Sequence, residues 1–144
     1  METSGFFPAE WREALVGRVD LLLWDFKDSN EARHVCWTGV GNAGILDNLC
    51  AMDRLGFPLR LRCIMVAGIN TERAHYDAIA RLCASLSHCE GVDLLPYHPY
   101  GGSKAEQLGR GNDGRPEWVP GKDILDQAVS CLRSQGIDVS CEGR

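Results

Sequence analysis

The chain has 144 residues, of which 44% are hydrophobic and 24% are charged, a composition typical of one globular domain. Its 15 basic and 20 acidic residues give a formal net charge of -5 and are scattered, which argues against a nucleic-acid-binding or polybasic membrane-binding surface. No apolar run approaches the roughly 20 residues needed to cross a bilayer, and no secretory leader pattern opens the sequence. We therefore expect one cytoplasmic domain over residues 1–144, with small-molecule or protein partners.

Helix and strand signals alternate along the first half of the chain. Pro8 suits the first turn of a helix, and the run Asp20–Lys27 (DLLLWDFK) is apolar on both faces, as expected of a buried parallel strand. After Asn42, apolar residues recur at intervals of three and four, which is typical of an amphipathic helix. The predicted elements are a short helix over 8–16, the strand Asp20–Lys27, a one- or two-turn helix capped by Ser29 or Asn30 and reaching Cys36, and a helix from Asn42 to Gly56.

The same alternation continues in the second half. The predicted elements are a strand over Leu59–Val66, a long helix capped by Thr71 with apolar residues as far as Leu86, a strand over Val92–Leu95, a Gly-rich loop from His98 to Pro120 with room for one helical turn near Ala105, a helix over Lys122–Ser134 and a strand over Ile137–Ser140. Strands separated by helices predict an α/β fold of parallel β/α units. In such folds ligands bind at the carboxyl ends of the strands.

The seven cysteines form no C-x-x-C pair and no tight cluster in the sequence. Their odd number, in a chain without a secretory leader pattern, favours reduced cytosolic thiols, several of them at apolar positions where cysteine acts as a small hydrophobic residue. Spacing alone therefore predicts no metal site.

Polar side chains follow the predicted strands where a ligand would bind. Strand alternation places Asp25 and Lys27 on one face, where they form either a solvated ion pair or part of a site. Arg60 and Arg62 share a face of the second strand, and a buried guanidinium needs an anionic partner from the protein or from a ligand. His98 follows the third strand beside the glycine loop, and the other three histidines are interpreted as structural.

Five short motifs stand in order along the chain, and together they resemble one known family. They are Thr3-Ser4-Gly5, the run Asp20–Lys27, Thr38-Gly39-Val40 with Asn42, Arg62–Gly68 with Asn70, and Leu94–His98 (LLPYH). This series resembles the glycyl-radical-enzyme activating enzymes, which are radical S-adenosylmethionine proteins typified by the pyruvate formate-lyase activating enzyme. The resemblance covers almost the whole chain. It departs from the family at Ala67, where a proline is usual, and at Ala105, where an aromatic residue often stands.

The resemblance implies a fold and a missing part. The family fold is a partial TIM-like barrel of six β/α units, and this chain is similar to its C-terminal half. The family's C-x-x-x-C-x-x-C loop, whose thiolates hold a 4Fe-4S cluster, and its Gly-Gly-Glu segment would both precede Met1. We therefore expect no iron-sulfur ligands in this chain and no cluster assembly by the chain alone.

The resemblance also implies site residues, although no catalytic residue is assigned. The positions similar to those lining the S-adenosylmethionine pocket are Asp25, Lys27, Arg62, Ile64 and His98. The positions similar to a nearby monovalent cation site are Glu2, Thr3 and Asp25. Arg62 would pair with the carboxylate of S-adenosylmethionine or with a neighbouring protein acid.

In the family reaction, S-adenosylmethionine is cleaved reductively to a 5'-deoxyadenosyl radical, which takes hydrogen from a glycine of the partner glycyl radical enzyme. Three interpretations of this chain remain open. It is a truncated activating enzyme that is inactive alone, one subunit of a split enzyme completed by a separate N-terminal half, or a non-catalytic binding or scaffold module for a glycyl radical enzyme. An open half-barrel exposes apolar edges, which favours a partner half or a homodimer.

Overall fold

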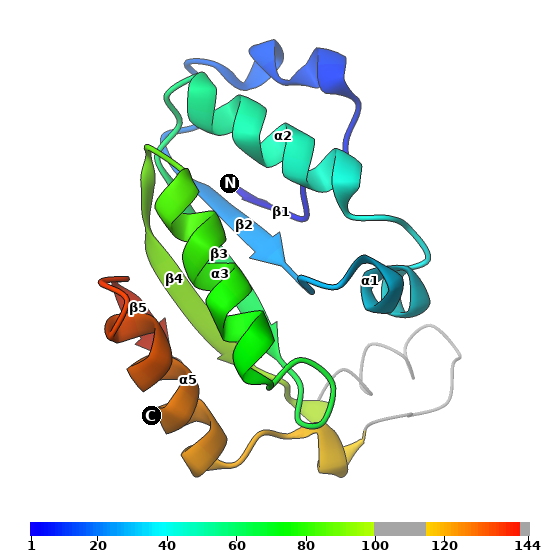
Figure 1. The fold of residues 1–144 in the computed structure, drawn as a ribbon. Helices are drawn as coiled ribbons and strands as arrows, with labels where there is room; N and C mark the ends of the chain where they lie inside the picture. Colours follow the sequence, from blue (N-terminus) through cyan, green and yellow to red (C-terminus); the bar gives the residue numbers. More distant parts are fainter. Residues whose placement is uncertain (100–114, 142–144) are drawn as a thin grey trace.

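Five parallel strands form one sheet, and each strand pairs with the next one along the chain (Figure 1). The computed structural model describes residues 1–99 and 115–141. Because the strands are parallel and follow their chain order, each connection returns to start the next strand on the same side. Right-handed crossovers that all advance in one direction along a sheet place their helices on one face. This confirms the predicted α/β fold of parallel β/α units. The strands are β1 (Glu2–Thr3), β2 (Leu22–Phe26), β3 (Leu59–Met65), β4 (Cys89–Pro96) and β5 (Val139–Cys141).

The helices α2, α3 and α5 lie against the same face of the sheet, and α1 lies beyond the end of β2 (Figure 1). Short 3-10 turns occur before β2 and before α5. The helical elements are η1 (Ala9–Trp11), η2 (Glu13–Leu15), α1 (Glu31–Thr38), α2 (Ala43–Arg54), α3 (Arg73–Ser85), η4 (Pro116–Trp118) and α5 (Lys122–Arg133). None of the helices in the described ranges is long and apolar enough to cross a membrane.

The sheet has an apolar face and a polar face, and β3 shows how they alternate. Leu59, Leu61 and Met65 are completely buried, whereas Arg60 and Arg62 between them are half-buried. Completely burying an apolar side chain of this size stabilises a fold by about 1.5–3 kcal/mol. The core therefore fixes which way the strand faces, and it directs the arginines away from the helices.

The name polar face is used for the surface formed by the side chains of Asp25, Arg60, Arg62 and Asp93, which come from three adjacent strands. The strand register brings them together, because Asp25 stands opposite Arg62, and Arg62 stands opposite Asp93. Charges from β2, β3 and β4 consequently share one surface.

The helix predicted over 8–16 is instead two 3-10 turns, η1 and η2. Trp11 is 59% exposed and Val16 is 53% exposed, so this segment has no continuous apolar stripe to pack against the core. Arg12 fastens the segment to α2 by donating to Asn48 Oδ1 at 2.7 Å and to Asp47 Oδ2 at 2.6 Å.

The predicted helix starts are correct to within two residues, but their capping partners differ. Asn30 caps α1 as expected, because its side chain accepts a hydrogen bond from the Arg33 backbone N–H. Asn42 precedes α2, yet its amide donates to the Asp28 carbonyl. Thr71 accepts a hydrogen bond from the Gly68 N–H, and Glu72 is the N-cap of α3.

The strand predictions identify the strands but miss some of their bounds. The strand predicted over Val92–Leu95 is longer and runs over Cys89–Pro96, and the last strand lies one to two residues later than expected. The two-residue β1 is too short for a periodicity to predict it. The helical turn expected near Ala105 falls outside the described residues.

Candidate functional site

The candidate site lies at the carboxyl ends of β2, β3 and β4. A pocket of about 340 Å³ with a mainly apolar lining opens there. Lys27 lines it from the end of β2, Ile64 from β3 and Tyr97 from just beyond β4. Trp37 of α1 and Trp118 of η4 form another part of the wall. Parallel β/α folds bind ligands at this end of the sheet, as the sequence predicts.

Four charged side chains meet beside this pocket. Arg62 Nη1 lies 2.5 Å from Glu2 Oε1 and 3.8 Å from Asp25 Oδ1. Lys27 Nζ lies 3.3 Å from the second Asp25 oxygen, Oδ2. The side chains of Asp25 and Arg62 are only 18% and 20% exposed. Two cations and two carboxylates from β1, the β2 end and β3 thus form one group, in which water screens the charges less than at an open surface.

The anionic partners of both strand arginines come from the protein. Arg62 is paired with Glu2 and Asp25, whereas Arg60 Nη2 lies 2.8 Å from Asp93 Oδ1 and Arg60 Nη1 lies 3.2 Å from Asp138 Oδ2. Burial alone would raise the pKa of Asp93, but hydrogen bonds from Arg60 and Ser140 outweigh burial and lower that pKa. Both guanidiniums are therefore paired with protein carboxylates on the polar face.

Asp25 retains capacity to bind a further donor. Its Oδ1 atom is buried and accepts no hydrogen bond from the described residues, although the Arg62 guanidinium lies 3.8 Å away. A carboxylate can accept about four hydrogen bonds, and a buried carboxylate oxygen without one is costly. A second hollow of about 250 Å³ touches Asp25 and Lys27 and is also lined by Ser4 and Thr38. A ligand amino group could therefore approach Asp25 from this side.

Asn70 joins the ends of β2 and β3 beneath the pocket. Its Nδ2 donates to the Lys27 carbonyl at 3.1 Å and to the Ile64 carbonyl at 2.8 Å, and its Oδ1 accepts from the Val66 N–H at 2.8 Å. The side chain is almost fully buried. Three backbone groups at the pocket floor are therefore satisfied by one amide, which fixes Lys27 relative to Ile64.

A second anchor lies between β2 and α3. Arg33 donates to both carboxylate oxygens of Asp28, from Nε and from Nη2, each at 2.8 Å. Arg33 Nη1 also lies 2.6 Å from Glu72 Oε1. The hydrogen bond with Asp28 is the largest cause of the raised pKa of Arg33. A two-pronged pair of this kind is geometrically specific, so it fixes α1 against the loop before α3.

Three aromatic rings pack edge to face at the pocket rim. The centroid of the Trp118 ring lies 5.3 Å from that of Trp37 and 5.6 Å from that of Tyr97. Arg115 Cζ lies 4.7 Å from the centroid of the Trp118 ring. The Trp118 carbonyl accepts from the Ala67 N–H at 2.9 Å, which ties η4 to the end of β3. Sequence reasoning missed Trp37 and Trp118, because no local period or motif links residues so far apart.

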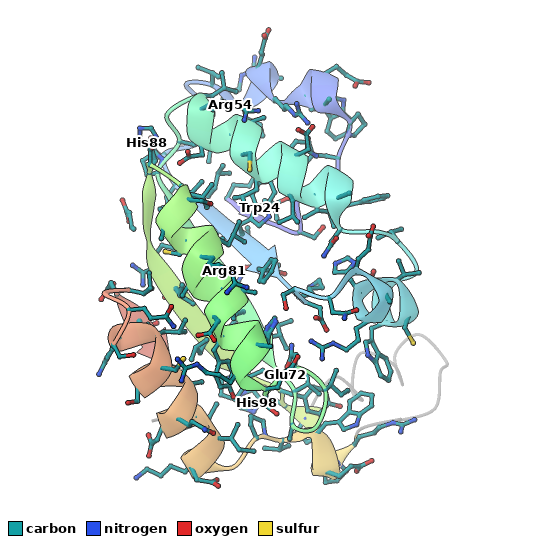
Figure 2. The ribbon with its side chains drawn as sticks, in the orientation of Figure 1. Trp24, Arg54, Glu72, Arg81, His88 and His98 are labelled. Atoms are coloured by element: carbon teal, nitrogen blue, oxygen red, sulfur yellow. The ribbon has the colours of Figure 1, made fainter. Side chains whose placement is uncertain are left out.

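The remaining predicted site residues occupy different positions. Thr3 Oγ1 accepts from the Gly5 N–H at 3.0 Å, and Thr3 stands opposite Trp24 in the register of β1 and β2. His98 follows β4 with an exposed side chain, and Figure 2 shows it near the end of the molecule where α3 begins, marked there by Glu72. His98 thus shares the carboxyl-end rim but does not line either of the two pockets described above.

The positions expected to hold a monovalent cation lie around Arg62. The Glu2 carboxylate contacts the guanidinium, and Asp25 flanks it. Within residues 1–99 and 115–141, no three His, Cys, Asp or Glu side chains are grouped so that they could hold a metal ion. In this structure the positive charge between the Glu2 and Asp25 carboxylates is the guanidinium of Arg62.

The chain is similar to characterised proteins both in sequence and in fold. No protein-family model matches the chain. The isethionate sulfite-lyase activating enzyme of Desulfovibrio desulfuricans is 33% identical to it, over 96% of this chain and 43% of that protein. The benzylsuccinate synthase activating enzyme of Thauera aromatica is 32% identical, over 99% and 44%. The choline trimethylamine-lyase activating enzyme of Oleidesulfovibrio alaskensis is 30% identical, over 97% and 46%.

Solved structures share the fold. A domain of the pyruvate-formate lyase-activating enzyme from Bacteroides vulgatus superposes with a TM-score of 0.79 at 24% identity, over 99% of this chain and 79% of that one. A radical SAM methyltransferase from Sphaerobacter thermophilus superposes with a TM-score of 0.72 at 18% identity, over 98% and 39%. The chain spans about half the length of the curated relatives that it matches.

Proposed function

Because the chain belongs to the glycyl-radical-enzyme activating enzymes, we propose that it is the part of such an enzyme that holds S-adenosylmethionine and receives the partner's glycine. One observation carries the proposal. Asp25, Lys27 and Arg62, which the family resemblance assigns to the cofactor, form one charged group beside a pocket at the carboxyl ends of the strands. The names of the relatives, each an activating enzyme, support the same activity for a complete protein.

The residues of the site fit the charges of S-adenosylmethionine. Its amino acid end carries an ammonium and a carboxylate, and the site offers the Asp25 carboxylate, which lines the smaller hollow, to the first and the cations Lys27 and Arg62 to the second. The apolar wall formed by Ile64 and Trp118 suits the nucleoside end. When bound, S-adenosylmethionine would supply the group that removes a hydrogen atom from the partner's glycine.

The chain's own residues would orient the cofactor and shield it. Lys27 and Arg62 would hold the carboxylate in place, because Asn70 fixes the backbone of Lys27 and the register of β2 and β3 fixes Arg62. The aromatic rim around Trp118 would exclude water from the reacting end. As the family resemblance implies, His98 would also contact S-adenosylmethionine, and Glu2 and Thr3 would help to hold a monovalent cation beside it.

The residues of this chain do not fit a 4Fe-4S cluster, and no step is assigned to one. The sequence has no C-x-x-x-C-x-x-C run, and the described residues hold no group of three suitable ligands. We propose that the cluster ligands belong to a segment or subunit outside this sequence, and that this chain alone is inactive. Anaerobic reconstitution with iron and sulfide should give no stoichiometric cluster, and a stoichiometric one would contradict the proposal.

A second candidate is a binding subunit without chemistry of its own. The polar face supports it, because half-buried paired arginines such as Arg60 and Arg62 suit a surface that another half-barrel or a second copy covers. If the covering partner is a separately encoded N-terminal half-barrel, this chain is one subunit of a split enzyme. If the only partner is a glycyl radical enzyme, this chain is a non-catalytic scaffold. The seven cysteines, none of them in a disulfide, support a reducing compartment, the cytoplasm, for either function.

Tryptophan fluorescence tests the proposed function directly. Trp37 lines the pocket and is 55% exposed, whereas Trp11 is 59% exposed and lies in η1, beside α2 rather than in the pocket lining. S-adenosylmethionine titrated into the chain should change the emission of the wild type and of Trp11→Leu, and the change should be much smaller in a double variant, Trp37→Leu with Trp118→Leu, which removes both tryptophans that line the pocket. Emission that stays constant in the wild type up to millimolar cofactor would contradict binding at this pocket.

A further inference from the structure

Two of the seven cysteines touch each other on the apolar side of the sheet. Cys83 lies near the end of α3 and Cys89 is the first residue of β4, and their sulfur atoms are 3.3 Å apart. No disulfide joins them. The Cys83 side chain is buried, whereas Cys89 is half-buried. The structure therefore holds two thiols in contact, one of which is accessible to a small molecule.

The turn between them is fixed in position. Asp53 of α2 accepts hydrogen bonds from the Ser87 N–H at 3.1 Å and from the His88 N–H at 2.8 Å. This carboxylate is nearly buried, so it holds the residues immediately before Cys89. The sulfurs need to approach by a further ~1.3 Å to reach the disulfide bond length of about 2.05 Å. Rotation about the side-chain bonds supplies such a movement without unfolding the turn.

The charges around the pair favour reaction at Cys89. The hydrogen bond from the Cys83 thiol lowers the pKa of Cys89 to about 7, and Arg60 on the neighbouring strand acts in the same direction. The hydrogen bond to Cys89, together with burial, raises the pKa of Cys83. Burial also raises the pKa of Cys63, which is completely buried, so that this third thiol stays protonated.

We propose that Cys83 and Cys89 are a site of reversible oxidation, at which a peroxide converts the dithiol to a disulfide. The Cys89 thiolate attacks one peroxide oxygen and the O–O bond breaks, which gives a sulfenic acid on Cys89 and releases water after protonation. The Cys83 sulfur then attacks the Cys89 sulfur, the S–O bond breaks, and a second water leaves. Two thiols and one hydrogen peroxide become one disulfide and two waters, and the two electrons pass from sulfur to oxygen.

The pair lies away from the candidate site. Cys89 begins β4, next to His88, whereas His98 follows the other end of the same strand, and Figure 2 shows these two histidines at opposite ends of the molecule. Oxidation at this site is therefore independent of the proposed cofactor function, and each can fail without the other.

Peptide mapping tests the proposal on the whole chain. Trypsin cuts after Arg81 and Lys104, so one peptide, residues 82–104, carries Cys83 and Cys89 and no other cysteine. After hydrogen peroxide and then an alkylating reagent, this peptide should have lost two hydrogens and carry no alkyl group. Dithiothreitol should restore two alkylatable thiols. Cys89, whose pKa is lowered, should be oxidised before Cys83, whose pKa is raised.

Variants at single cysteines show whether the internal disulfide requires both Cys83 and Cys89. Cys83→Ala should abolish the internal disulfide and leave Cys89 as a sulfenic acid or a higher oxide, and Cys36→Ser, which removes an exposed thiol, should leave the disulfide yield unchanged. If Cys83→Ala folds poorly, Cys89→Ala serves instead, because it should also abolish the internal disulfide. Two results would overturn the proposal: a wild-type peptide that stays fully alkylatable while Cys36 is oxidised, or an intermolecular disulfide in place of the internal one.

Discussion

Asp25 and Arg62 stand opposite each other in the register of β2 and β3, with Oδ1 and Nη1 3.8 Å apart. The spacing is too long for a hydrogen bond but within the range of an ion pair, and Asp25 Oδ1 accepts no hydrogen bond among the described residues. The pair thus neutralises charge on the polar face, and Asp25 Oδ1 is a buried acceptor without a hydrogen bond.

Asn70 should be the most important single amide of the site. Asn70→Ala removes three hydrogen bonds and leaves the carbonyls of Lys27 and Ile64 and the Val66 N–H without them. We expect the free energy of unfolding to fall by about 2–4 kcal/mol, measured by urea denaturation. Asn30→Ala, which removes only the α1 cap, is the matched control and should cost about 1 kcal/mol. Equal losses in the two variants would show that Asn70 is not the anchor described.

His75 should make the protein less stable in mild acid. It is completely buried and stacks on Phe26, with the ring centroids 5.9 Å apart, and the Ser29 N–H donates to its Nδ1. Burial lowers the pKa of His75 below its ordinary value of 6.5. Below pH 6.5 the unfolded chain therefore binds a proton that the folded protein does not. This linkage decreases the free energy of unfolding as the pH falls, by up to about 1.4 kcal/mol per pH unit.

The measurement is a urea denaturation series between pH 7 and pH 5, with His75→Gln as the variant that cannot titrate. The pH dependence of the wild type should exceed that of the variant. An NMR titration of the His75 ring gives a second readout that does not require the variant to fold. A ring that titrates at or above pH 6.5 would contradict the prediction.

Strand alternation predicted much of this site, because parity is a local property of a chain. It placed Asp25 beside Lys27 and put Arg60 and Arg62 on one face, and the structure pairs Asp25 with Lys27 and Arg62, whereas Arg60 pairs with other carboxylates. Parity could not choose the partners of the arginines, since Glu2 and Asp138 come from distant strands or loops whose pairing depends on the whole sheet.

Other features depend on tertiary packing alone. Trp37 and Trp118 meet only because α1 and η4 both pack at the carboxyl ends of the strands, and neither residue belongs to a sequence motif. The contact between Cys83 and Cys89 spans the end of a helix, a turn and the start of a strand, a spacing that no helical or strand period marks. The 8–16 segment failed as a helix because Leu15 packs against the core while Trp11 and Val16 are exposed, so no continuous apolar stripe faces the core.

Gly5 should be intolerant of a side chain for two separable reasons. Its φ is +75°, and a Cβ there would overlap the Trp24 ring. Gly39 has a φ of +80° with open space around it, so it serves as the control for backbone strain alone. Gly39→Ala should cost about 1–2 kcal/mol and Gly5→Ala about 3 kcal/mol or more, because displacing the buried ring adds an overpacking cost. Thermal and urea unfolding of both variants compare the two costs, and similar values would contradict close packing at Gly5.

Calorimetric titration of S-adenosylmethionine into the wild type, Arg62→Ala and Arg60→Ala tests the central claim most directly. The two arginines are matched, since each is 20% exposed and paired with two carboxylates on the same strand face. Losing a charge-assisted hydrogen bond costs about 1.5–3 kcal/mol, so Arg62→Ala should weaken binding at least about tenfold, whereas Arg60→Ala should stay within about twofold of the wild type. Equal affinities in all three proteins, or no binding by the wild type, would contradict the assignment of this site to the cofactor.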